Sequence, residues 1–164
     1  MFSSDPDSTG PIVPAGHHLA SFGRRAGGLA IDLLLINGPA MAAFYAAGVD
    51  PFDPDSELLW LGITITLVGL VYETLAVWRW GRTVGKWATG TRVVGMPDGA
   101  PLDLARSFQR SLVPTTLSAI PTVGVFLGVG VYTWAFLDPL RQGVHDKAAG
   151  SIVVQAGRGQ HHEP

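Results

Sequence analysis

Two acidic residues stand inside long apolar segments of this chain, where charges are rare. Asp32 is the only ionisable residue in residues 26–49, and Glu73 is the only one in residues 58–78. A carboxylate inside a bilayer costs about 2.5–3.5 kcal/mol on insertion scales and normally faces the protein interior. Asp32 and Glu73 are therefore candidates for a site that holds a cation or a proton.

The two acids are expected to lie at a similar depth. Glu73 lies five residues before Trp78, near the end of the second segment, and Asp32 lies early in the first. If the two segments are antiparallel helices, both carboxyl groups occupy one layer of low dielectric constant. They cannot easily both ionise there, so one holds a proton or the two share a cation. The alternative is that an arginine or a backbone group neutralises each acid as part of packing.

Arg25 and Asp32 are seven residues apart, which places them on one face of a helix. Their separation along the axis is about 10.5 Å, at about 1.5 Å per residue. That is too long for a comfortable ion pair within one helix. Each residue is therefore expected to find its partner in another element.

The elements that must position these residues are membrane helices. The chain of 164 residues is 47% hydrophobic and 15% charged, with a mean hydropathy of +0.28, whereas soluble domains are roughly 25% charged. Residues 26–49 and 58–78 are each long enough to cross a hydrocarbon core of about 30 Å. The predicted fold class is therefore an all-α membrane protein with two full transmembrane helices.

A third apolar region, residues 112–137, is interrupted by Pro114, Pro121 and Gly124. It forms either one long kinked span or two helices, roughly residues 104–120 and 122–137, that turn back near Pro121. The positive-inside rule helps to choose, because six bases lie between the second and third apolar regions and none lies in the acidic loop 50–57. Bases also follow Leu137, so both termini are expected in the cytoplasm. This favours two spans plus a Pro-hinged helical hairpin over three plain spans.

The remaining segments complete the predicted organisation. Residues 1–20 are rich in Ser, Asp, Pro and Gly and predict a disordered tail. Residues 21–155 form the transmembrane domain, and residues 156–164 form a C-terminal tail. Within the domain, the β-branched runs 91–94 and 151–154 are expected to pair in a small cytoplasmic sheet. A helix that begins after Asp103 is amphipathic, and its bases are expected to lie on anionic lipid.

Several functions are excluded by the residues present. The chain has no Cys, and its five His residues have no helical metal-ligand spacing. It also has no G-x-S-x-G motif. The segment Gly81 to Lys86 has three residues between its glycines instead of four, and Trp87 stands where a phosphate loop needs Ser or Thr. A net charge of −2 argues against nucleic acid as a partner. We expect no enzyme, cofactor, metal or nucleic-acid partner.

Three blocks of the sequence together resemble the RDD family of small integral membrane proteins. They are RRAGGLAIDLLL, GRTVGKWATGTRVVGMPDGAPLDLARSFQRSLV and DPLRQGVHDKAAGSIVV, which cover roughly residues 20–155. The family is named for one Arg and two Asp, and these match Arg25, Asp32 and Asp146. The resemblance implies a multi-pass protein of the bacterial cell (inner) membrane, for which transport of an unidentified ligand, and ion exchange in some members, has been proposed.

Two functions are compatible with these observations. In the first, the protein is a transport-related module whose Asp32 and Glu73 form an intramembrane site, and Arg25 and Asp146 close the cytoplasmic side. In the second, it is a non-catalytic accessory or assembly subunit. Its expected partners are the lipid bilayer and either further copies of itself or a larger membrane complex. In both, Asp146 is expected to pair with Arg25 or with a base of the middle segment, Arg82 or Lys86.

Overall fold

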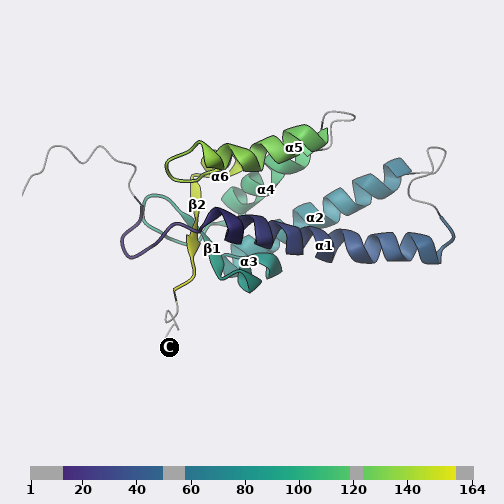
Figure 1. The fold of residues 1–164 in the computed structure, drawn as a ribbon, viewed down its shortest axis with the longest axis horizontal. Helices are drawn as coiled ribbons and strands as arrows, with labels where there is room; N and C mark the ends of the chain where they lie inside the picture. Colours follow the sequence, from purple (N-terminus) through teal and green to yellow (C-terminus); the bar gives the residue numbers. More distant parts are fainter. Residues whose placement is uncertain (1–12, 50–57, 119–123, 158–164) are drawn as a thin grey trace, which may run out of the picture.

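The protein is mostly helical, with one small sheet (Figure 1). The structure is a computed structural model that describes residues 13–49, 58–118 and 124–157. In chain order, the elements are α1 (Phe22–Ala46), α2 (Leu58–Trp80), α3 (Val84–Ala88), β1 (Thr91–Gly95), α4 (Leu104–Ser118), α5 (Gly124–Thr133), the 3-10 turn η1 (Trp134–Phe136), α6 (Val144–Ala148) and β2 (Ser151–Gln155).

Two helices, α1 and α2, are long and apolar enough to cross a membrane, over Phe22–Ala46 and Gly62–Trp80. They extend lengthwise away from the sheet and diverge from each other in the view of Figure 1. The only buried residues of α1 are Gly28 and Asp32, whereas Leu34 is 73% exposed. A helix that buries its acidic residue and exposes its leucines is typical of a helix surrounded by lipid.

Helix α4 has the opposite orientation to the one predicted. Arg110 and the neighbouring Ser107 and Ser111 are buried, while Leu104 and Phe108 are exposed. The prediction that the bases of this helix lie on anionic lipid is wrong. The amphipathic pattern is real, but the polar face turns inward because acidic side chains of other helices neutralise it there.

The third apolar region, residues 112–137, includes the last part of α4 and all of α5. Helices α4 and α5 pack against each other (Figure 1). Pro114 lies inside α4 without ending it. The predicted hinge at Pro121 lies outside the described residues.

The strands β1 and β2 pair antiparallel, with a register that runs from Thr91 opposite Gln155 to Gly95 opposite Ser151. The predicted pairing of these two runs is confirmed. On the other edge of β2, Leu19 bridges Val154 and the backbone N–H of Ala20 donates to Val153 O at 3.0 Å. Residues 13–20 were expected to belong to a disordered tail, but those next to α1 are ordered because β2 offers them a free edge.

A small hydrophobic core ties the sheet to the helices. Its fully buried members come from α2, both strands and the segments beside them: Ala20, Val77, Val93, Leu102, Ala149 and Val153. The sheet thus forms a base at one end of the helices, from which α1 and α2 project.

Helices α1 and α3 approach most closely where two glycines face each other. A Cβ atom on Gly85 would lie 1.9 Å from the carbonyl oxygen of Gly28 and 2.9 Å from the carboxyl carbon of Asp32. Only a residue without a side chain allows α3 to pack this closely on α1.

We therefore expect Gly85→Ala to lower the free energy of unfolding by at least about 1–3 kcal/mol, the usual cost of overpacking. Thermal unfolding in detergent measures this. The matched control is Gly62→Ala in α2, where a Cβ meets nothing within 4 Å. Ala should be neutral or slightly stabilising there, by about 0.5–1 kcal/mol. Equal stabilities of the two variants would contradict the close approach.

Candidate functional site

The carboxylate of Asp146, at the start of α6, lies between two guanidinium groups and is fully buried. Arg25 of α1 donates to Oδ2, and Arg110 of α4 approaches Oδ1 through Nε at 3.0 Å and Nη2 at 2.9 Å. The backbone N–H of Gly143 also donates to Oδ2, at 3.1 Å, as is usual for an acid in the first turn of a helix. Asp146 therefore joins α1, α4 and α6.

Arg110 extends the network to α2. Its Nη1 donates to Glu73 Oε1 at 2.7 Å, and the same oxygen accepts from Lys86 Nζ at 3.2 Å. Arg110 is 2% exposed, so water cannot solvate its charge, and Glu73 and Asp146 must neutralise it. Glu73 therefore shares its charge between a base of α4 and a base of α3.

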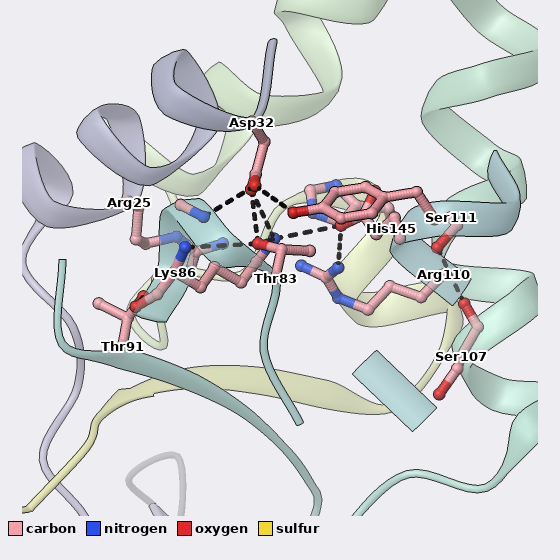
Figure 2. Close-up of polar contacts among 12 residues, drawn as sticks. Arg25, Asp32, Thr83, Lys86, Thr91, Ser107, Arg110, Ser111 and His145 are labelled. Carbon is pink, nitrogen blue, oxygen red and sulfur yellow. Dashed lines mark hydrogen bonds and ion pairs between the residues drawn. The ribbon is translucent and has the colours of Figure 1, made fainter. Parts of the chain in front are cut away.

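The carboxylate of Asp32 caps the loop and the helix that follow α2. It accepts from the hydroxyl of Thr83, from the backbone N–H of Gly85 at 2.8 Å and from Tyr72 OH at 2.9 Å. Lys86 Nζ lies 4.0 Å from its Oδ2. Figure 2 shows the carboxylate of Asp32 pointing toward Thr83 and Lys86. The segment that superficially resembles a phosphate loop therefore holds a carboxylate of its own chain.

These contacts form one chain of alternating charges, which we call the ion-pair network: Arg25, Asp146, Arg110, Glu73, Lys86 and Asp32. The three bases balance the three acids. The members come from α1, α2, α3, α4 and α6. Neutral pairing of this kind is what allows so many charges to lie among apolar helices.

A buried histidine lies beside Asp146. His145 Nε2 is 3.4 Å from Asp146 Oδ1, and its ring packs on Tyr132 with 4.8 Å between centroids. Among the described residues its Nδ1 has no hydrogen-bond partner. Burial, which the charge of Asp146 offsets only in part, lowers the pKa of His145 to about 4.

Burial alone would raise the pKa of Asp146, but the surrounding positive charges outweigh it. His145 when protonated, Arg110 and Arg25 together hold this pKa below its ordinary value. Asp146 is therefore ionised and His145 neutral at physiological pH. Asp146 is thus a permanent negative charge between two permanently positive arginines, and His145 adds no charge to the network at neutral pH.

Sequence reasoning identified part of this site. The expected contact between Arg25 and Asp146 is present, and Arg25 and Asp32 each find partners in other elements, as their separation required. Asp32 and Glu73 come together through the ammonium of Lys86. Glu73 accepts from Arg110, and Asp32 accepts from the backbone N–H of Gly85, as in the alternative in which an arginine or a backbone group neutralises each acid.

Sequence reasoning missed Arg110, Tyr72 and Thr83 as members of the site. Arg110 had a usable signal, because Ser107 and Ser111 share its helical face, and the three form a polar stripe. A polar stripe on a membrane helix points to the protein interior. Within the described ranges, no group of three or more His, Cys, Asp or Glu is arranged to hold a metal ion.

The geometry brings together the three residues that matched the RDD signature, and a comparison with family models agrees. The model of the RDD family matches residues 19–150. The chain belongs to the RDD family. With its two apolar and largely exposed helices, it is a membrane protein. Neither the curated proteins nor the solved structures contain a match to this chain.

In this RDD protein, Asp146→Ala should leave two guanidinium groups around a vacant, buried position. Breaking a buried pair in this way costs about 3–5 kcal/mol. Thermal or denaturant unfolding in detergent measures the loss. Asp98→Ala is the control, because Asp98 is exposed and accepts only from the backbone of Ala100. If Asp146→Ala loses no more stability than Asp98→Ala, the contacts of Asp146 with the two arginines contribute only as much as a surface ion pair, about 0–1 kcal/mol.

A second prediction concerns pH. Because the folded-state pKa of His145 lies near 4, below its ordinary 6.5, the unfolded chain takes up a proton at this residue first. Stability should be complete above about pH 6.5 and fall as the pH is lowered to about 4, by about 3 kcal/mol. The lowered pKa of Asp146 acts only below this window. Unfolding midpoints measured from pH 7.5 to 4.5 should show the decline in the wild type and a flatter profile in His145→Gln. Parallel profiles would refute the assignment.

Proposed function

We propose that this protein exchanges a monovalent cation for a proton across the membrane, with Asp32 and Glu73 as the cation-binding acids. One observation carries the proposal: the ammonium of Lys86 lies among oxygens of three separate elements. Its Nζ is 3.2 Å from Glu73 Oε1, 3.4 Å from Thr83 Oγ1 and 4.0 Å from Asp32 Oδ2. Carboxylate and hydroxyl oxygens are also the ligands of alkali cations, so a metal ion can compete with the ammonium.

The charges of the network define how such a site exchanges ions. Asp32 and Glu73 carry two negative charges, which Lys86 and Arg110 balance. Arg110 is held by Asp146 as well as by Glu73, whereas Lys86 contacts Asp32 only at 4.0 Å. Lys86 is therefore the more readily displaced base. Entry of one cation preserves neutrality when Lys86 releases one proton.

The orientation proposed for this function places the sheet in the cytoplasm of a cell with an inner membrane. The described residues at both ends of the chain lie at the sheet end of the molecule (Figure 1). Helices α4 and α5 have 15 and 10 residues, about 22 and 15 Å at 1.5 Å per residue, and each is shorter than the hydrocarbon core of about 30 Å. Two full spans and a re-entrant hairpin fit these lengths, and both termini are then cytoplasmic.

The test uses the full chain in liposomes that contain a pH-sensitive dye. Adding Na⁺ or K⁺ outside should drive protons out of wild-type vesicles, and vesicles without protein supply the background. Asp32→Asn should reduce the rate to that background because the site loses one of the two negative charges that attract the cation. Asp98→Asn, an exposed acid outside the network, should retain the wild-type rate.

Size-exclusion and thermal profiles verify that each variant is folded. A folded Asp32→Asn protein with the wild-type rate would refute the role of Asp32. Absence of cation-driven proton movement in the wild type, with Na⁺, K⁺ and Li⁺ alike, would refute exchange.

A second candidate function is favoured by the outer surface. The apolar side chains of α1 remain uncovered in the monomer, including Leu34 at 73% exposure. We propose as the alternative that partner helices cover this surface, in a homo-oligomer or as an accessory subunit of a larger membrane complex. Purification in mild detergent distinguishes these: a single larger complex supports the accessory role, and a defined homo-oligomer contradicts it.

A further inference from the structure

A groove on the outer side of α2 and α3 has the chemistry of a lipid site. Its volume is about 380 Å³, and its lining is almost wholly apolar. The lining residues come from the last two turns of α2, the following loop and α3: Tyr72, Leu75, Ala76, Trp80, Arg82, Thr83, Val84 and Trp87. Of these residues only Thr83 belongs to the proposed cation site.

The groove lies where a membrane helix ends. The candidate span of α2 runs to Trp80, and Trp80 and Trp87 are 61% and 67% exposed. Exposed tryptophans at the end of a span are typical of the lipid headgroup level. From Trp80 to Tyr72 the groove follows eight residues of helix, about 12 Å. It therefore extends from the headgroup level into the acyl-chain region.

The charge at the mouth of the groove is positive and not neutralised. Arg82 lines the groove, and neither Arg82 nor Arg79, which lies three residues earlier near the end of α2, forms an ion pair within the described ranges. No acid lines the groove. This contrasts with the bases inside the protein, Arg25, Lys86 and Arg110, which are all paired with acids.

We propose that this groove binds one anionic phospholipid, with the phosphate near Arg82 and an acyl chain along Tyr72 and Leu75. Apolar walls with an unpaired base at the headgroup end are complementary to such a lipid. The volume of about 380 Å³ lies in the lower part of the range for small-molecule sites, and it suits the part of the lipid that enters the groove, one acyl chain. A packed helix about 10 Å wide and 12 Å long would fill about 900 Å³. This proposal does not depend on either proposed function.

The groove shares two of its lining side chains with the surroundings of Asp32. Tyr72 and Thr83 line the groove and also donate hydrogen bonds to Asp32. The hydroxyl of Tyr72 accepts the backbone N–H of Val84 at 2.9 Å, which fixes the first turn of α3 against the groove. A bound lipid therefore packs against the same side chains that hold Asp32.

The chain has no cysteine, so a single probe position can be introduced cleanly. Val84→Cys places an environment-sensitive fluorophore in the groove, and Leu34→Cys places it on the exposed face of α1 as the control. The full chain is reconstituted in phosphatidylcholine vesicles that contain the same small mole fraction of either brominated phosphatidylglycerol or brominated phosphatidylcholine. Bromine quenches the fluorophore by contact.

At Val84→Cys, brominated phosphatidylglycerol should quench at least two-fold more than brominated phosphatidylcholine, and at Leu34→Cys the two lipids should quench equally. Adding Arg82→Gln to Val84→Cys should bring the ratio to one. Adding Arg24→Gln instead should leave it unchanged, because Arg24 is exposed and lies outside the groove.

Three outcomes would contradict the proposal. Equal quenching by both lipids at Val84→Cys would mean that the groove contacts only bulk lipid. Absence of quenching, together with a disulfide between two copies of unlabelled Val84→Cys in a parallel sample, would mean that a second copy of the chain covers the groove. A ratio that persists in the Arg82→Gln background would also exclude Arg82 as the headgroup contact.

Discussion

The structure depends above all on one buried carboxylate held between two arginines. Asp146 anchors the start of α1 through Arg25 and the middle of α4 through Arg110, and the N–H of Gly143 fixes it at the start of α6. In a medium of low dielectric constant these attractions are strong, and an unpartnered member would be very costly. The helices therefore have little freedom to rearrange separately, because moving one of them exposes a charge on another.

This constraint explains why the protein is polar inside and apolar outside. The ion-pair network occupies the space between helices that a soluble protein would fill with leucine and valine. Apolar packing is concentrated at the sheet, around residues such as Val77 and Val153. The helices beyond the sheet have only a modest apolar interior, and their outward side chains require lipid or a partner to cover them.

The sequence predicted contacts best where the prediction does not depend on which side of an element faces lipid and which faces protein. The pairing of the two β-branched runs and the contact between Arg25 and Asp146 follow from propensity, charge and reach. The orientation of α4 was predicted wrongly because helical periodicity identifies two faces but not which of them is inside. That choice depends on where partners for Arg110 lie, and those partners, Glu73 and Asp146, come from segments 37 and 36 residues away. Lys86 between Asp32 and Glu73 was likewise visible only once α3 had been placed.

The pairing of β2 with β1 and with residues 18–20 has a consequence for biosynthesis. Residues 18–20 and β1 hydrogen-bond to opposite edges of β2, and Asp146 joins Arg25 across 121 positions of sequence. A ribosome makes α1, α2 and α4 before it makes either of these closing partners. Arg25 and Arg110 therefore gain their shared partner, Asp146, only after α6 has been made. A nascent chain stopped before α6 lacks both Asp146 and β2, so neither the ion-pair network nor the sheet can be completed in it.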